Sequence, residues 1–587
     1  MKGIYVQPEF RRMKNNPLSL LSLFFIALAL ILIRIFYWHE AHHIFTWDSL
    51  GYYLYLPSHF IYHDVSHLKW FPEIAKAYQL PGNFYQASMQ PNGNYVFFYS
   101  MGVAIIQLPF FFIGHWCAGA LGYAQDGFSA PYQISVCIGM IFYSVVGLCF
   151  LRSVLLHYFS DAIAASVLLL VTLATNYLQY TAVDGGFTHG YLFAVFCVLL
   201  FFSVKWHSIP SLTNSFAIGF LVGLTVVIRV TDLLVILVPI FWNTSTKELR
   251  TEKWKLIRSN KKFLLTAIIG GFLPLIPQLI YWKAVTGKWI HQMGSKWDFL
   301  LPHFQVLVGF EKGWFIYTPV TLLMVAGLFF MREKNFRRGV LIYFLLNVWL
   351  VCAWHMWRYG GSYSARALMQ SMAVMALPLG TFIERFSKGK MKWLILVVGI
   401  YLCVVNVFQI WQYNKTIIHY NDMNAKYYAV VYLNPSPSPI DMSLLDTDER
   451  LKNENDFKML NEIKSDSIRT INFSSDSSTI FLNEKISDLL KEKKSNEAWL
   501  KLSVEVKSEW GAHDSYFTAA ISHSGKTIKE RNIRMQNGIC IQHEWNKIEY
   551  WFSIPENTND DELKIFCHTH AWQNILLRNF SLRLYSK

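Results

Sequence analysis

The sequence predicts a mostly α-helical, polytopic membrane protein with a C-terminal β-sandwich domain outside the membrane. Of its 587 residues, 53% are hydrophobic and 17% are aromatic, which is too apolar for one soluble globule. Apolar runs of about twenty residues, the length that crosses a bilayer, recur up to residue 413. After a proline-rich segment, short stretches of alternating hydrophobicity replace these runs.

About eleven apolar runs are candidate membrane spans. They lie near residues 18–37, 97–121, 133–156, 162–183, 187–204, 216–242, 263–282, 315–331, 339–356, 367–383 and 393–413. The first run is long and has no small-residue cleavage site. We therefore interpret it as a retained anchor and not as a signal peptide.

The net charge of +14 comes largely from basic residues in short loops near residues 2–14, 247–262, 332–338 and 385–392. By the positive-inside rule these loops are cytoplasmic, so the charge indicates orientation and not a nucleic-acid partner. The N-terminus is then cytoplasmic. The loops 38–96, 284–314 and 355–366 are extracytoplasmic, as is everything after about residue 414. The predicted location is the inner (plasma) membrane, with the C-terminal domain in the periplasm.

The topology of residues 97–242 allows two interpretations. Strict alternation through five spans would put residues 184–189 inside. Weak basic signals at Arg152 and Lys205 favour the reverse, with one run not crossing fully. Arg229 also divides the run 216–242, whose halves could form a pair of short helices. We favour residues 184–189 and Arg229 facing outside.

The change in composition sets the predicted domains. Residues 1–414 form the membrane module, and residues 415–440 form a linker with a stiff Asn-Pro-Ser-Pro-Ser-Pro segment. Residues 441–587 form the outer domain, which begins with a polar stretch of helix-like and loop-like pieces. From about residue 497, antiparallel strands are predicted at 499–507, 516–522, 546–554, 562–567 and 575–585.

This predicted sandwich resembles the carbohydrate-binding jelly rolls, in which aromatic faces stack on sugar rings. The rings that could do so are those of Trp510, His513, His568, His570 and Trp572. The same side chains could instead fill the sandwich. Cys540 and Cys567 could pair in an oxidising compartment.

Three polar clusters interrupt the apolar sequence on the predicted outer face. The first external loop opens with Asp48, which is flanked by Trp47, Tyr52, Tyr53 and Tyr55. A second cluster is Asp-Gly-Gly-Phe-Thr-His-Gly at 184–190, and a third, at 354–366, contains two arginines. Charged groups at a membrane boundary tend to be functional or paired. Together the clusters predict a carboxylate base with cationic anchors.

This layout resembles the GT-C superfamily of lipid-linked sugar transferases, which includes protein mannosyltransferases and the aminoarabinose transferase. The matching pieces are one helix followed by a long external loop that opens with Asp48, then Asp184 and His189 after the fourth run. The bipartite segment 219–232 and the soluble tail also fit, and the resemblance covers roughly residues 10–415. It implies a polyprenyl-phosphate sugar as donor and a lipid, glycan or protein as acceptor.

The resemblance also implies roles for single residues. Asp48 would accept the proton of an acceptor hydroxyl during an inverting displacement. Arg358, Arg366 and Arg229 would bind the leaving lipid phosphate. The supporting polar residues would be Asp64, Asp184, His189, Tyr52 and Tyr53. No metal ligand is assigned, although Asp48 and Asp184 could share a divalent ion.

Simpler interpretations stand beside these roles. Asp48 could cap a helix beginning at Ser49, and His189 could be an interfacial hydrogen-bonding residue. Arg358 could snorkel at the interface, and Arg366 could pair with a nearby carboxylate.

Two other functions compete with sugar transfer. His39-Glu40-Ala41-His42-His43 fits the H-E-x-x-H pattern of zinc proteases, but no third ligand is evident in the sequence. A glycolipid flippase or exporter is the remaining alternative, although the chain shows no internal repeat and carries a large external loop.

Overall fold

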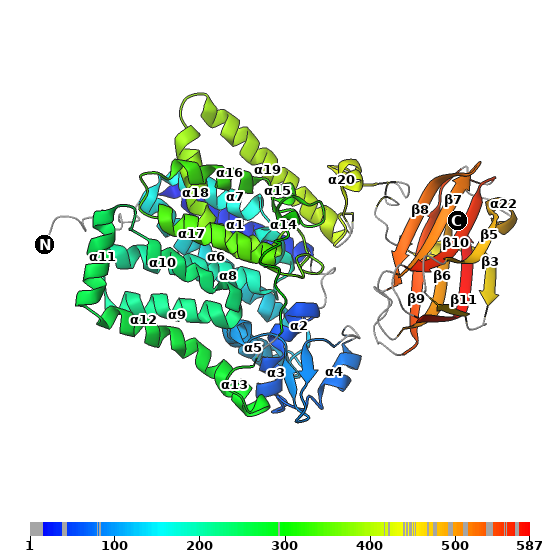
Figure 1. The fold of residues 1–587 in the computed structure, drawn as a ribbon, viewed down its shortest axis with the longest axis horizontal. Helices are drawn as coiled ribbons and strands as arrows, with labels where there is room; N and C mark the ends of the chain where they lie inside the picture. The colour runs from blue at the N-terminus through cyan, green and yellow to red at the C-terminus, as the bar shows by residue number, and fades with distance from the viewer. Residues whose placement is uncertain are drawn as a thin grey trace. The chain divides into compact units, whose positions relative to one another are not determined.

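The computed structural model describes residues 16–37, 44–78, 80, 84–291, 294–415, 417–420, 423–437, 441, 444, 449, 451, 453–465, 469–472, 478–490, 497–508, 515–535, 544–556, 558, 560–569 and 574–587. The chain divides into two compact units, Met1–Trp411 and Gln412–Lys587, here called the helical unit and the C-terminal unit. Figure 1 shows helices in the first and strands in most of the second.

The helical unit consists of helices, the loops that join them and one small hairpin. Its helices are α1 (Pro17–Phe36), α2 (Trp47–Tyr53), α3 (Tyr55–Phe60), α4 (Phe71–Ala77), α5 (Gly102–Ala120), α6 (Ala130–Tyr158), α7 (Asp161–Leu173), α8 (Thr188–Ser208), α9 (Leu212–Ile228), α10 (Leu237–Phe241), α11 (Lys247–Ser259), α12 (Lys262–Phe272), α13 (Ile276–Thr286), α14 (Gln305–Val308), α15 (Trp314–Tyr317), α16 (Val320–Gly327), α17 (Arg337–Ala353), α18 (Met372–Phe386) and α19 (Met391–Asn414), the last of which runs on into the C-terminal unit. The hairpin pairs β1 (Ala87–Met89) with β2 (Tyr95–Phe97).

Among the described residues, seven helices are long and apolar enough to cross a membrane, so this is a multi-pass membrane protein. They are Pro17–Phe36, Gly102–Ala120, Ala130–Tyr158, Thr188–Ser208, Lys262–Thr286, Arg366–Phe386 and Met391–Asn414. The predicted runs 162–183, 216–242 and 315–331 contain shorter apolar helices. The run 216–242 is broken as predicted, because Arg229 adopts an extended backbone between α9 and the turn Val230–Ile236.

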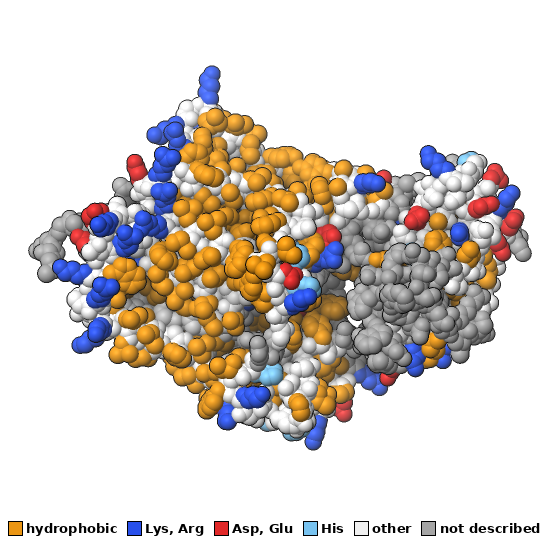
Figure 2. All heavy atoms as spheres, viewed as in Figure 1, with side chains coloured by type: hydrophobic (Ala, Val, Ile, Leu, Met, Phe, Trp, Pro, Cys, Tyr) orange, Lys and Arg blue, Asp and Glu red, His pale blue; other side chains and the backbone are white. Residues whose placement is uncertain are grey.

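Large apolar side chains face outward from these helices. Phe24 of α1 is 62% exposed and Phe272 of α12 is 59% exposed, as expected for side chains that contact lipid. Figure 2 shows hydrophobic side chains over most of the visible face of the helical unit, with lysines and arginines gathered at its left edge near α11. The mostly α-helical membrane fold predicted from the sequence is therefore confirmed.

The start of α1, the end of α6 and the loop before α17 lie on one side of the helical unit. Arg152, near the end of α6, donates from Nε to Ser19 Oγ (2.7 Å) and from Nη2 to Asn16 O (3.0 Å), at the start of α1. On the same side, the ring of Tyr158 packs against that of Phe336, with centroids 5.0 Å apart. The first polar loop lies at the other end of α6, where Gln133 Oε1 accepts the backbone N–H of Ile44.

Both ends of α5 lie against the loop that carries Asp48. Tyr99, just before α5, donates to Asp48, and Tyr53 donates to Gly127 O in the turn after α5 (2.5 Å). The loop that carries Asp48 therefore lies alongside α5. The turn at 184–189 is on this side too, because Gly186 lies directly against Ser49.

Two glycines of α9 allow close packing against α12. A Cβ at Gly219 would lie 1.8 Å from the carbonyl oxygen of Ala267, and one at Gly223 would lie 2.0 Å from that of Gly271. Small residues one turn apart are a common means of bringing membrane helices together.

We expect Gly223→Val to force these helices apart and to destabilise the protein by about 1–3 kcal/mol, the usual effect of overpacking. The expected result is a lower apparent Tm of the detergent-solubilised protein. Gly294→Val is the matched control, because an added Cβ at Gly294 meets nothing within 4 Å. Equal melting of both variants would contradict this packing.

The C-terminal unit contains two antiparallel sheets that enclose one core. Besides α20 (Ala425–Val431) and α22 (Ile486–Leu490), its strands are β3 (Lys458–Ser465), β4 (Arg469–Asn472), β5 (Ser478–Lys485), β6 (Ala498–Ser508), β7 (Ser515–His523), β8 (Lys526–Arg534), β9 (Asn546–Ile554), β10 (Glu562–Thr569) and β11 (Asn574–Ser586). One sheet has the order β5-β10-β7-β8 and the other β3-β11-β6-β9, with β4 also paired to β11. Alternate residues of β6, such as Leu502 and Val504, are buried in the shared core.

The five predicted strands match β6, β7, β9, β10 and β11, but strands also occur before residue 497. The sandwich therefore starts near Lys458, and residues 458–485, which we expected to be helix-like and loop-like, contribute β3, β4 and β5. Three strands that were not predicted, β3, β5 and β8, are edge strands. β9 is also an edge strand, but its residues alternate between buried and exposed, and it was predicted. An edge strand is paired on one side only, and where its apolar alternation is weak it is easily missed.

The sugar-binding and disulfide hypotheses for this unit fall mostly on residues that are not described, namely Trp510, His513, Cys540, His570 and Trp572. His568 is half-buried, and its ring stacks on Tyr516 with centroids 5.3 Å apart. Cys567 is buried in β10 and has no disulfide partner among the described residues.

Candidate active site

Asp48 lies in the first turn of α2, and its carboxylate is bound by three side chains. Oδ1 accepts hydrogen bonds from the hydroxyls of Tyr85 (2.8 Å) and Tyr99 (2.6 Å). Oδ2 accepts from Nη2 of Arg366 (2.8 Å). The side chains of Asp48 and Arg366 are only 18% and 12% exposed. Asp48 therefore belongs to a buried polar cluster, and the helix it lies in begins at Trp47, not at Ser49.

Tyr99 reaches Asp48 because the backbone of α2 leaves room for its ring. A Cβ on Gly51 would lie 2.3 Å from Cδ2 of Tyr99, so a glycine is required at this position. The backbone carbonyl of Tyr99 accepts the hydroxyl of Tyr55 (2.7 Å). The ring of Tyr52 lies beside that of Tyr99, with centroids 4.4 Å apart. The aromatic residues around Asp48 thus build a wall on one side of its carboxylate.

The surroundings of Asp48 keep it ionised. Burial opposes ionisation, but the charge of Arg366 and the hydrogen bonds from Tyr99, Tyr85 and Arg366 outweigh it, so the pKa of Asp48 lies below its ordinary value. Burial and the adjacent negative charge of Asp48 raise the pKa of Tyr85 and Tyr99, because both disfavour the phenolate form. At neutral pH the cluster therefore contains one carboxylate, one guanidinium and two neutral hydroxyl donors.

Arg366 comes from the end of the third polar cluster, where the chain enters the helical turn Arg366–Ser371 ahead of α18. Its guanidinium lies over the ring of Phe187, 5.3 Å from the ring centroid. Phe187 belongs to the second polar cluster. The three polar clusters predicted to converge on one face therefore do meet, at Asp48, Phe187 and Arg366.

A second series of interacting polar side chains begins next to this cluster. Nδ1 of His189 lies 3.0 Å from Oε1 of Gln370, whose Nε2 donates to Asp232 Oδ1 (2.8 Å). Asp232 in turn pairs with Arg229, at 3.7 Å. Arg229 and Gln370 line a small pocket, which also borders Ala367, the residue after Arg366.

The other residues predicted for the site lie in different surroundings. Asp64 accepts backbone N–H groups of Ser66, His67 and Lys69 and so holds a turn of its own loop. Tyr53 is fully buried and stacks on Phe45. Asp184 accepts the side-chain amide of Gln179 (3.0 Å). Arg358 is 54% exposed and forms a two-pronged pair with Glu311 (2.5 and 3.2 Å).

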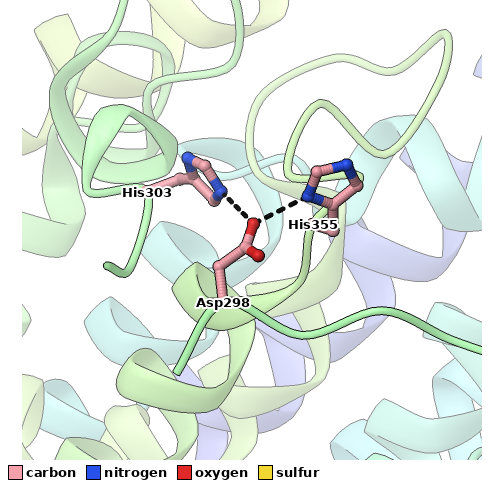
Figure 3. Close-up of side chains that lie close together, drawn as sticks. All are labelled: Asp298, His303 and His355. Carbon is pink, nitrogen blue, oxygen red and sulfur yellow. Dashed lines mark hydrogen bonds and ion pairs between the residues drawn. The ribbon is translucent and has the colours of Figure 1, made fainter. Parts of the chain in front are cut away.

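The candidate metal ligands lie at several places in the chain. The histidines and glutamate of the 39–43 motif lie outside the described residues. Among the described residues, the group of carboxylate and imidazole ligands close enough to share an ion is Asp298, His303 and His355, and it includes neither Asp48 nor Asp184 (Figure 3).

Sequence reasoning missed several members of these clusters. Tyr85 and Tyr99 are two of many aromatic residues in the first external loop, and no local pattern distinguishes them. Gln370 and Asp232 are polar residues within apolar runs. A polar group in such a run is rarely unpaired, so these two positions could have been singled out from the sequence.

We expect Tyr99→Phe to move the acid limb of the pH–activity profile to higher pH. The substitution removes a hydrogen bond that favours the carboxylate, so the pKa of Asp48 rises, and a base at Asp48, as expected from the sequence, would be lost earlier as pH falls. The measurement is transfer rate against pH. Tyr95→Phe, in the same loop but without a bond to Asp48, should leave the limb in place; equal limbs for both variants would contradict this role of Tyr99.

Comparison with known proteins gave distant structural matches. No family model and no curated protein matches the sequence. The structure is similar to the oligosaccharyltransferase AglB from Archaeoglobus fulgidus in complex with an inhibitory peptide and a dolichol-phosphate, with 12% identity over 73% of this chain and a TM-score of 0.38. It is also similar to ArnT from Cupriavidus metallidurans in the apo state, with 12% identity, 60% of this chain and 64% of that chain covered, and a TM-score of 0.36.

Both matched proteins are GT-C membrane glycosyltransferases, the superfamily that the sequence resembles. The present chain spans only 59% of the length of the oligosaccharyltransferase. At this identity and TM-score the likeness assigns no activity, so the function is argued below from the site itself.

Proposed function

We propose that this protein is a membrane glycosyltransferase that moves a sugar from a polyprenyl-phosphate donor to an acceptor hydroxyl on the extracytoplasmic face. The observation that carries this proposal is the buried carboxylate of Asp48, held ionised by Arg366 and two tyrosines. A membrane protein has little structural need for such a cluster at the side of its helices where a lipid-linked substrate would arrive.

The reaction needs one group to accept a proton and one to stabilise an anion. The acceptor oxygen attacks the anomeric carbon of the donor while the bond from that carbon to the phosphate oxygen breaks. The proton of the acceptor passes to Asp48, and the electron pair leaves with the lipid phosphate. A single displacement of this kind inverts the anomeric centre.

Arg366 is the first candidate for the phosphate. Its guanidinium touches the proposed base directly, so a phosphate bound to its remaining donors would lie next to the reacting carbon. Arg229 lines the adjoining pocket and is the second candidate. Arg358, which is paired with Glu311 and largely exposed, is the third and is proposed for an outer part of the donor path.

The supporting residues position the proposed base and the arginines. Tyr85 and Tyr99 orient Asp48, and Tyr52 packs beside Tyr99. His189 and Gln370 hold Asp232, which in turn fixes Arg229. Asp184 and Asp64 accept hydrogen bonds from residues of their own segments and so shape those segments.

The test is a transfer assay in proteoliposomes with short polyprenyl-phosphate hexoses and pentoses and a panel of lipid, glycan and peptide acceptors. We expect release of the free polyprenyl phosphate, measured by mass spectrometry, together with a product of inverted anomeric configuration, measured by NMR. Movement of the intact donor lipid across the bilayer without cleavage would instead identify a flippase and overturn the proposal.

A further inference from the structure

Asp298, His303 and His355 form a cluster that the proposed transfer reaction does not use. Asp298 and His303 lie between α13 and α14, and His355 follows α17. Figure 3 shows both imidazole rings aimed at the carboxylate of Asp298. One oxygen, Oδ2, lies 2.9 Å from Nε2 of His303 and 2.8 Å from Nδ1 of His355. The ligand atoms of all three residues lie within 4.8 Å of one another.

The backbone holds these three residues in place. Each of them donates its own amide N–H across to the opposite segment: Asp298 to Ala353 (2.6 Å), His303 to Cys352 (2.7 Å) and His355 to Lys296 (3.1 Å). Trp297 and Trp354 form an antiparallel bridge between the same segments. The ring of Trp357 stacks on that of His303, with centroids 6.0 Å apart. The cluster is therefore preorganised by its main chain and not only by contacts among its side chains.

Two imidazoles and one carboxylate form a typical ligand set for a divalent transition metal, and zinc in particular. Ligand atoms around a tetrahedral zinc are about 3.4 Å apart, given metal–ligand bonds of about 2.0–2.1 Å. Small side-chain rotations would open the observed 2.8–2.9 Å separations to that distance.

Comparison with a second aspartate–histidine contact shows which features distinguish the cluster at Asp298. Nδ1 of His67 lies 3.7 Å from Asp64 Oδ1, but there is one imidazole in that contact, and the Asp64 carboxylate accepts backbone N–H groups. The cluster at Asp298 instead directs two ring nitrogens to one oxygen. Its residues are 23% (Asp298), 27% (His303) and 48% (His355) exposed, so an ion could enter and a water could fill the remaining position.

We propose that Asp298, His303 and His355 bind one divalent transition-metal ion, with zinc preferred, which clamps the segment 296–303 to the segment 352–357. The second segment leads directly to Arg366. Trp297, beside Asp298, and Ala367, beside Arg366, line the same pocket. The ion thus stabilises the outer wall of that pocket. This metal site stands independently of the proposed transferase activity.

The test uses the full chain without an affinity tag, incubated with ZnCl2 and dialysed, with its metal content measured by plasma mass spectrometry. We expect about one zinc per chain, falling at least about fivefold in Asp298→Asn, His303→Ala and His355→Ala. The double variant Asp64→Asn/His67→Ala is the matched control and should keep its zinc. His39→Ala/His43→Ala removes the separate H-E-x-x-H histidines; zinc lost in this variant and retained in the cluster variants would overturn the proposal.

A second measurement separates a bound metal from a purely hydrogen-bonded cluster. With zinc, backbone amide exchange in residues 353–357 should slow relative to EDTA-treated protein, and this difference should vanish in His355→Ala. Cobalt in place of zinc should give visible absorption bands that change in His303→Ala. A wild-type protein that binds less than about 0.1 equivalent of zinc or cobalt contains an aspartate–histidine hydrogen-bond cluster only, and the proposal fails.

Discussion

Asp48→Asn is expected to lower sugar transfer by about 10²–10⁴-fold, the usual contribution of a general base. Asparagine has nearly the same shape and can still accept a hydrogen bond from Tyr85 or Tyr99, but it cannot take the proton of the acceptor. The loss should therefore appear in the rate at saturating donor, with donor binding largely kept. Initial rates in proteoliposomes measure this effect.

Asp64→Asn is the control for Asp48→Asn. It removes a second carboxylate from the same external loop, but one that is bonded to backbone N–H groups of its own turn. We expect only a small change in rate. Asp48→Asn with wild-type activity, or an equal loss in both variants, would exclude Asp48 as the base.

Arg366→Ala is expected to lower transfer by about 10²–10³-fold, the effect of removing one preorganised group that stabilises developing negative charge. The substitution takes away the positive charge proposed to bind the leaving phosphate and also leaves the buried Asp48 without its counterion. Because that charge is lost, the pKa of Asp48 should rise as well. Both the donor KM and kcat should therefore worsen.

Two variants separate the functions of Arg366. Arg366→Lys keeps the charge but not the planar fork, so we expect partial activity, about tenfold below wild type. Arg358→Ala breaks an exposed pair with Glu311 and should have a smaller effect than Arg366→Ala, of a few-fold, because exposed pairs contribute about 0–1 kcal/mol. A larger loss in Arg358→Ala than in Arg366→Ala would transfer the main phosphate role to Arg358.

The parts of the fold that depend on short-range sequence patterns were predictable. Apolar length gave the membrane helices, and period-two alternation gave β6, β7, β9, β10 and β11, because both patterns come from which faces of an element are buried. The edge strands β3, β5 and β8 escaped prediction because an edge strand can keep little apolar alternation, whereas β9, also at an edge, alternates and was predicted.

The site was predictable only in part. Asp48, Arg366 and the 184–190 turn stood out because polar residues at a membrane boundary are unusual. Which of them pair did not follow from the sequence. Tyr85, Tyr99 and Arg366 lie 37, 51 and 318 residues from Asp48 along the chain, and their contacts depend on how distant loops fold together.

The sequence by itself determined that this protein crosses a membrane, that a strand-rich region follows the helices, and that an acidic residue follows the first span. Those features depend on composition and short-range periodicity. Only the tertiary structure decided that Arg366 neutralises Asp48 and that Asp298 meets two histidines. Hydrogen bonds act over about 3 Å in space, and sequence separation does not report that distance.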